Sequence, residues 1–356
     1  MVLTLIFTSI EVVCISNAEF GSVGNKMKKN SLSIAKPFYS VSHSQGTTGA
    51  ILYNNPSMRN WYLNNSLVLQ ARADALGSAQ PKLCMDICQS NIEDNPNIDR
   101  QQLLMTFLDG CISRVIRNMI DRGWYVYFGG VDDYYMKGRA GYHTRHYLHD
   151  GLICGYDSEK STYSIFVYDE YMRYSLFELP QRCFDRARKS SEQMEYCGMF
   201  VAVRPQQIQI KFDPVLMLEK LRDHLSPSSA WNYDESGVTV YGIEAHECAI
   251  HYLESVAALE RERNIDIRPF KMLLEHKRFM LERLETLERY YGLEADYSIR
   301  YKKVAVVAEK MWNRCLHYVM TLNASDLSEM IGKIRIMRDL EREILSDAVD
   351  MISAQE

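Results

Sequence analysis

The sequence predicts an α+β protein in which an antiparallel sheet packed on helices is followed by an all-helical C-terminal region. Two changes in the spacing of apolar residues along the chain support this prediction. Between residues 124 and 212, short runs of aromatic and β-branched residues alternate with turn residues, which is typical of strands. From Asp213 onward, apolar residues recur at helical spacing. We therefore expect an α+β domain over residues 1–212 and a helical domain over residues 213–356.

The elements of the first domain follow from local signals. A helix is expected over residues 100–122, because Asp99 is a good N-cap, apolar residues recur three and four apart, and Gly123 ends the pattern. A hairpin connector is expected at 157–161, and a short helix after Pro180. The expected strands are 124–130, 151–157, 162–169, 172–179 and 199–212, the last interrupted at Pro205.

The second domain reads as a series of amphipathic helices. Asp213 before Pro214, and Ser325, are favourable helix starts. The expected helices are 214–225, 241–263, 266–292, 296–322 and 325–353. Residues 21–100, by contrast, are polar and rich in turn-forming residues.

Composition argues against several classes of protein. The chain has 356 residues, which suggests about two domains, and carries 41 Lys and Arg against 46 Asp and Glu. A net charge of −5 argues against a general nucleic-acid binder, because neutralising phosphates requires an excess of basic residues. Nine scattered cysteines indicate free thiols and a cytoplasmic protein. The sequence has neither a Walker-type loop nor a strand followed by G-x-G-x-x-G, so no cofactor is expected.

The opening segment, MVLTLIFTSIEVVCIS, does not fit an export signal. Its first basic residue is Lys26, Glu11 interrupts the apolar run, and no small-residue cleavage site follows. We interpret it as an interior core segment. No later segment approaches about 20 uncharged apolar residues, so no membrane span and no membrane partner are expected.

The densest group of reactive side chains lies in YHTRHYLHDGLICGYD. His143, His146 and His149 recur every three residues, which would suit zinc on a helix, but His149 leads into a strand, where alternate residues point to opposite faces. A second interpretation uses His149 with Asp169, which ends the next strand and would lie beside it across an antiparallel hairpin. Such a pair is the base and orienting acid of a nucleophile–His–Asp triad, unless both residues simply terminate strands.

Two other candidate sites are weaker. Asp132 and Asp133, in VDDYY after a strand, form either paired acids for a cation or amine substrate or a solvated turn. Arg268, directly before Pro269 at a helix start, would bind an anion or form a salt bridge between the domains. HECAIH places His246 and His251 five apart, which does not match the metalloprotease spacing.

Four segments resemble a known family: GWYVYFGGVDDYY, HDGLICGYD, FVYDE and DIRPFKMLLEHKRFMLERLE. Together they resemble the N-terminal-domain family of the butirosin-biosynthesis H protein, in patches from Val12 to Tyr291 and most strongly over 123–179. The resemblance implies a papain-like fold related to bacteriocin peptidases. It also implies transfer of an acyl group from a carrier-protein thioester to an amine in bacterial secondary-metabolite biosynthesis. On this basis His149 would be the general base and Asp169 its orienting carboxylate.

The nucleophile is where the sequence departs from this family. The family's cysteine lies at the start of an early helix, upstream of a segment resembling IEVVCISNAEF, and almost nothing precedes that segment here. Either the start is truncated relative to the family or this branch lacks the nucleophile. Cys14 is available, but its context matches a position after that helix, and its apolar neighbours indicate a buried thiol.

Three functions are therefore expected alternatives. The first is an acyltransferase, whose partners would be an acyl-carrier or peptidyl-carrier protein and a small-molecule amine. The second is a binding or scaffold partner of an assembly-line protein that has no nucleophile. The third is a peptidase that processes a leader peptide, since one fold supports several chemistries.

Overall fold

The structure is a computed structural model of the 356-residue chain, and the part it describes forms two compact units. Unit 1 comprises the chain up to Pro37, His43–Asn54 and Asn95–Ile208, and unit 2 comprises Phe38–Ser42, Asn55–Asp94 and the chain from Gln209 onward. The described residues are 28–41, 43–74, 81–88, 95–103, 111–171, 173–194, 199–227, 230–234, 237–259, 264–293 and 296–354.

This division corrects the predicted one. The last boundary, at Ile208, lies close to the expected position, but residues 1–212 do not form one unit, because 38–42 and 55–94 belong to unit 2. The physical reason is strand pairing. Strand β2 (Leu69–Ala73) hydrogen-bonds to β11 (Gly237–Tyr241), which comes far later in the chain. Pairing between such distant segments leaves no trace in local composition or period.

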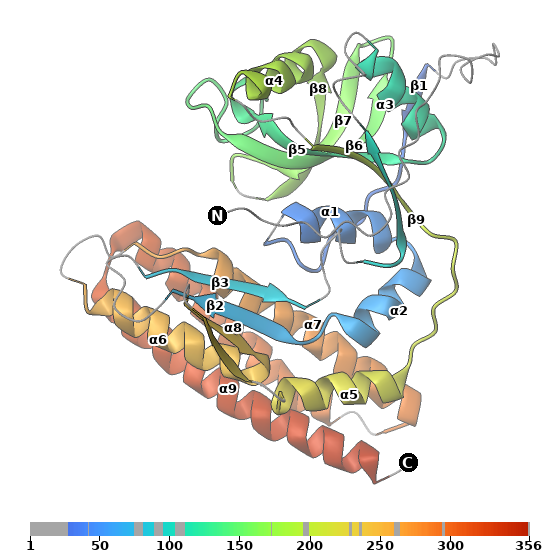
Figure 1. The fold of residues 1–356 in the computed structure, drawn as a ribbon. Coiled ribbons are helices and arrows are strands. Elements are labelled where there is room, and N and C mark those ends of the chain that lie inside the picture. Colours follow the sequence, from blue (N-terminus) through green and yellow to red (C-terminus); the bar gives the residue numbers. More distant parts are fainter. Residues whose placement is uncertain are drawn as a thin grey trace. The chain divides into compact units, whose positions relative to one another are not determined.

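Unit 1 is built on an antiparallel sheet with the strand order β4–β9–β5–β6–β7–β8, to which β1 is added by pairing with β6. The strands are β1 (Lys29–Ser31), β4 (Ile98–Leu103), β5 (Tyr125–Asp132), β6 (Leu148–Asp157), β7 (Thr162–Tyr168), β8 (Tyr174–Pro180) and β9 (Met199–Pro205). Helices α3 (Ile112–Asp121) and α4 (Gln181–Gln193) cover one face and α1 (His43–Leu52) packs on the other (Figure 1). This arrangement confirms the α+β class.

Most predicted elements of unit 1 are present, and two differ. Residues 98–103 form β4 and pair with β9, so the predicted helix over 100–122 is wrong at its start. Helix α3 begins only at Ile112, and Gly123 follows its end with a φ of +80°. The predicted strand over 199–212 ends at Pro205, because proline supplies no backbone N–H to continue a ladder.

The core of unit 1 follows from strand alternation. Val126 and Phe128 of β5 project with Ile153 of β6 and Val167 of β7 into one apolar cluster beneath α3 and α4. Gly151 lies opposite Phe128, and a Cβ there would approach Val167 Cγ1 to 2.0 Å. The ladder between β5 and β6 shifts register between Phe128 and Val131, which is a β-bulge directly before the candidate site.

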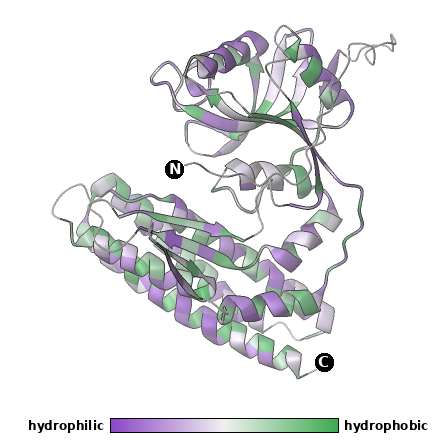
Figure 2. Cartoon of the chain, in the orientation of Figure 1, coloured by the Kyte–Doolittle hydropathy of each residue, from purple (hydrophilic) through white to green (hydrophobic). Residues whose placement is uncertain are grey.

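Unit 2 combines a four-stranded sheet in the order β10–β11–β2–β3 with a set of long helices (Figure 1). Its additional strands are β3 (Leu83–Ile87) and β10 (Trp231–Asp234). Its helices are α2 (Pro56–Asn65), α5 (Pro214–Leu225), α6 (Ala245–Ala257), α7 (Arg268–Tyr291), α8 (Tyr297–Thr321) and α9 (Ala324–Ser353). Apolar and polar residues interleave along the last three, as expected for amphipathic helices (Figure 2).

The predicted helices of unit 2 are confirmed, with small shifts. Helix α5 has the predicted bounds, and the Asp213 side chain caps it by accepting a hydrogen bond from Leu216 N at 3.0 Å. Helix α6 begins four residues later than expected, because Tyr241 is still part of β11. At α9 the cap is Asn323 rather than Ser325, whose backbone N–H it accepts at 3.1 Å. Among the described helices, none is both long enough and apolar enough to cross a bilayer.

The helices of unit 2 enclose a fully buried group of ionisable side chains. Lys277 Nζ lies 2.6 Å from Glu341 Oε2, and Tyr301 donates to Oε1 of the same carboxylate at 2.5 Å. His246 Nε2 approaches Glu341 to 3.4 Å and His224 Nε2 to 3.7 Å. Because desolvation disfavours charge on imidazole, burial lowers the pKa of both histidines, that of His246 to about 3.

Candidate active site

The candidate site lies in unit 1, where β5 ends and β6 begins. In the ladder between these strands Val131 pairs with His149 and Asp132 pairs with Leu148. Asp133 then opens a short 3-10 helix, η3 (Asp133–Tyr135). The end of one strand and the start of its neighbour thus bring two consecutive aspartates against two histidines.

His149 is held by Asp133. Its Nδ1 is hydrogen-bonded to Asp133 Oδ2, and Arg139 holds the same carboxylate through Nε at 2.8 Å and Nη2 at 3.1 Å. Asp133 and Arg139 are buried, whereas the His149 side chain is 22% exposed. Burial disfavours the charge on Asp133, but the hydrogen bonds from His149 and Arg139 outweigh it and keep the pKa of Asp133 below its usual value.

This geometry sets the tautomer of His149. An ionised carboxylate only accepts hydrogen bonds, so Nδ1 is the protonated nitrogen, and in the neutral ring Nε2 is the base. Arg139 fixes the carboxylate in turn, and it also donates to the Tyr168 carbonyl oxygen. In this arrangement His149 is a general base, Asp133 is the acid that orients it, and the Arg139 guanidinium holds the acid in position.

His146 and Asp132 form a second pair of the same kind. The distance from His146 Nδ1 to Asp132 Oδ2 is 2.7 Å, and Ser190 Oγ of α4 donates to the same oxygen at 2.7 Å. The backbone N–H of Tyr134 donates to Oδ1 at 3.1 Å. Asp132 is buried, while the His146 ring is half exposed and stacks on Tyr134 with centroids 4.3 Å apart.

Asp132 and Asp133 are therefore not part of a solvated turn. Both are buried, and each accepts a hydrogen bond from an imidazole. The sequence pointed to this pair of acids as a site for a cation or an amine, and in the structure they hold protein side chains instead. The sequence does contain a hint of this contact, because VDD lies at the end of β5 and His149 lies at the start of the neighbouring strand β6. Only the register shows which residues meet.

Asp169 is not the partner of His149. In the ladder between β6 and β7, Leu152 pairs with Phe166 and Ile153 with Ile165. The same register, continued, places position 169 opposite position 149, as expected for an antiparallel hairpin. The Asp169 carboxylate turns into its own loop, however. It accepts hydrogen bonds from the backbone N–H of Arg173 and Tyr171, both at 2.9 Å, and from Ser175 Oγ at 2.9 Å. The predicted pairing of Asp169 with His149 is therefore wrong. The carboxylate that orients His149 is that of Asp133.

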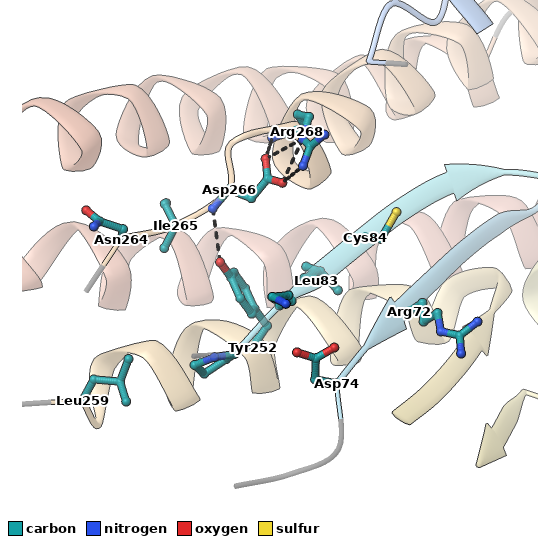
Figure 3. A pocket seen from close by; sticks show the side chains of 12 residues that line it. Arg72, Asp74, Leu83, Cys84, Tyr252, Leu259, Asn264, Ile265, Asp266 and Arg268 are labelled. Atoms are coloured by element: carbon teal, nitrogen blue, oxygen red, sulfur yellow. Dashed lines mark hydrogen bonds and ion pairs between the residues drawn. The ribbon is translucent and has the colours of Figure 1, made fainter. Parts of the chain in front are cut away.

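Arg268 forms an ion pair with a neighbour in its own unit. Its guanidinium Nε lies 2.8 Å from Asp266 Oδ2 and 3.0 Å from Oδ1, in the turn before α7 (Figure 3). Asp266 also accepts the backbone N–H of Arg268 at 2.9 Å. The salt bridge predicted between domains is therefore replaced by one within unit 2, and the positive charge expected to bind an anion is matched by Asp266.

Four thiols within the described residues are held in their protonated form, which is a poor nucleophile. Burial raises the pKa of Cys154, Cys248 and Cys315 to about 12 and that of Cys88 to about 11. Cys14, the candidate nucleophile, lies outside the described residues.

The three histidines do not form a metal site. His143 stacks on Tyr142, with centroids 4.0 Å apart, rather than joining His146 and His149. Across the described ranges, no group of three or more His, Cys, Asp or Glu side chains is arranged to hold a metal ion.

The first turn of α1 packs close to this site. A Cβ on Gly46 would come within 2.2 Å of the Tyr174 ring, so the helix lies directly on that side chain. Tyr174 contacts Tyr168, with ring centroids 4.3 Å apart, and the Tyr168 carbonyl is the group that Arg139 binds. The first turn of α1 is therefore packed on Tyr174, which contacts the tyrosine whose carbonyl oxygen accepts from Arg139.

No model of a protein family matches the sequence, and no curated protein is significantly similar to it.

Proposed function

We propose that the chain is an acyltransferase that moves an acyl group from a carrier-protein thioester to an amine, with His149 as the general base. The observation that carries the proposal is the hydrogen bond from His149 Nδ1 to the buried, Arg139-bound Asp133. It leaves Nε2 as the basic nitrogen on a ring that is partly exposed. The papain-like relationship and the role in bacterial secondary metabolism are parts of this proposal that come from the sequence resemblance.

The proposed step needs only a base and a proton donor. The amine nitrogen attacks the thioester carbonyl, the C–N bond forms, and the C–S bond breaks as the tetrahedral intermediate collapses. His149 Nε2 accepts the proton from the attacking amine and returns it to the leaving thiolate. Asp133 stabilises the imidazolium that exists between these two transfers, as the acid of a His–Asp pair does in other acyl transfers.

A thioester assay tests the proposal directly. The full chain is incubated with an acyl N-acetylcysteamine thioester, a small carrier mimic, and an amine, and the released thiol is measured. We expect His149→Gln to lower the rate by about 100-fold or more, because general-base catalysis contributes that much. Asp169→Asn is the matched control and should retain the rate. Equal rates for the wild type and His149→Gln would contradict a role for His149.

The same samples show whether an acyl-enzyme forms. Mass spectrometry of the protein after exposure to the thioester would locate an adduct. An adduct on Cys14 would support the cysteine expected from the family, and an adduct on any other residue would assign the nucleophile to that residue. Turnover without an adduct would support direct attack by the amine.

A second candidate function is a binding or scaffold partner of a carrier protein. In that case the thioester assay shows no turnover, while the carrier protein still binds the chain. Leader-peptide cleavage, the third alternative, would depend on His149 in the same way, with a peptide as substrate.

A further inference from the structure

We infer that unit 2 carries a separate ligand site, a cavity that binds a small organic cation with an apolar body. The cavity has a volume of about 760 Å³ and is lined by residues of α6 and of the hairpin formed by β10 and β11. This size falls in the range of small-molecule sites. Its described lining residues all belong to unit 2, so the inference is independent of the Asp–His site and of the proposed function.

Aromatic rings form much of the wall. Trp231 and Tyr233 stand two apart on β10 and so project from the same face, with their planes inclined by 17° and their centroids 6.5 Å apart. Tyr233 is 75% exposed, which is unusual for a large ring and places it at the mouth of the cavity. Faces of tryptophan and tyrosine rings attract cations electrostatically.

The deeper wall is fixed and apolar. Tyr252 of α6 is buried, and its hydroxyl accepts the backbone N–H of Asp266 at 3.2 Å (Figure 3). Cys248, one helical turn earlier, lines the same cavity and is also buried, and Val238 closes the side toward the sheet. A ligand with an apolar body would remove this surface from water, which is favourable.

A carboxylate at this wall favours a cation. Asp74 follows β2, is partly buried, and forms neither an ion pair nor a side-chain hydrogen bond with any described residue. It lines this cavity and an adjoining one of about 540 Å³, and Figure 3 shows it projecting into the same space as Tyr252. A partly desolvated carboxylate without a partner is unfavourable, and a bound cation would supply the missing charge.

The other charged groups of the wall do not offset this preference. Asp234 pairs with Arg72 at 3.3 Å, so its charge is matched. Lys82 also lines the cavity but is exposed, so its strongly hydrated ammonium group can stay in contact with water. Among the described residues that line the cavity, Asp74 is therefore the carboxylate whose negative charge is not balanced by an ion pair. It lies beside the ring of Tyr252 (Figure 3).

The first test is selectivity for charge. Titration of the full chain with benzyltrimethylammonium, phenylacetate and benzyl alcohol compares a cation, an anion and a neutral molecule that share an aromatic ring. We expect the cation to bind at least about tenfold more tightly than the other two, by calorimetry or ligand-observed NMR. Absence of binding by the cation at millimolar concentration, or equal binding by phenylacetate, would overturn the inference.

The second test assigns the site. Asp74→Asn removes the charge and keeps the shape, and it should weaken binding of benzyltrimethylammonium by about tenfold. Asp234→Asn is the matched control and should change the affinity much less, because Arg72 already neutralises that carboxylate. Ala258→Phe, which fills part of the cavity, should also weaken binding. Unchanged melting temperatures keep the comparison valid, and full affinity in Asp74→Asn would overturn the assignment.

Discussion

His149 is hydrogen-bonded through Nδ1 to Asp133, a residue 16 positions earlier in the chain and buried against Arg139. Two adjacent strands produce this contact, because β5 ends at Asp132 and β6 begins at Leu148, and the two strands are antiparallel neighbours. The contact fixes the tautomer of a partly exposed imidazole. It therefore links the register of one strand pair to the proton chemistry proposed for the site.

Removing the charge of Asp133 should destabilise unit 1. Asp133→Asn leaves the Arg139 guanidinium buried without its counter-ion, and breaking such a pair costs about 3–5 kcal/mol. Asp169→Asn should cost about 1 kcal/mol or less, because its partner Arg173 is largely exposed. Urea unfolding of the two variants measures both values. Equal effects would contradict the importance assigned to the buried pair.

Acid should destabilise unit 2 because of its buried histidines. Burial lowers the pKa of His224, His246 and His276 in the folded chain, whereas in the unfolded chain histidine titrates near 6.5. Below about pH 6.5 the unfolded chain therefore binds more protons, so stability falls as the pH decreases. The pKa of Glu341, which burial would raise, is held well below its usual value chiefly by Lys277, so a further loss follows below about pH 4.5.

The histidine contribution is measurable by unfolding at several pH values. Each buried histidine adds up to about 1.4 kcal/mol per pH unit below about pH 6.5, for as long as it stays neutral in the folded chain. His224→Phe keeps a ring of similar size and removes one titrating group. The slope should then fall by about one such contribution, with little loss at pH 8, since His224 Nε2 lies 3.7 Å from Glu341 and outside hydrogen-bonding distance. An unchanged slope would contradict this account.

Two glycines should respond in opposite ways to alanine. At Gly151 the added Cβ would collide with Val167 Cγ1 and with the Phe128 ring, so Gly151→Ala should destabilise the chain by about 1–3 kcal/mol. At Gly332, within α9, the added Cβ meets nothing within 4 Å, so Gly332→Ala should stabilise the helix by about 1 kcal/mol. Chemical denaturation measures both changes, and destabilisation by Gly332→Ala would contradict the second.

The deeply buried cysteines should resist alkylation. Burial raises the pKa of Cys154, Cys248 and Cys315 to about 12, so the reactive thiolate is scarce at pH 8 and access is closed. Peptide mapping after iodoacetamide treatment should find these three unmodified in the native chain and modified in urea. Rapid modification of Cys154 in the native chain would contradict its place in the core.

Much of the fold could be predicted because its signals are local. Helix α5 and the three long helices after it follow from apolar spacing and caps, and β5 to β8 follow from short apolar runs between turns. The errors in the predicted secondary structure occur where pairing with a strand far away in the sequence determines the conformation. Residues 100–103, the expected first turn of a helix, belong to β4 instead, because they form a ladder of hydrogen bonds with β9. Residues 69–73 and 83–87, in a polar region, form β2 and β3, because β11 completes their sheet.

The sequence by itself determined most of the helices and strands and pointed to His149 as a candidate base, with Asp132 and Asp133 as either a weaker site or a solvated turn, because these properties depend on neighbours along the chain. Tertiary structure alone decided which carboxylate orients His149. That choice depends on a β-bulge, on the antiparallel register of β5 and β6, and on the turn that draws Asp169 toward Ser175. The bulge and the register are set by contacts between residues of different strands, where hydrogen-bond geometry and burial select one partner among several of equal chemistry.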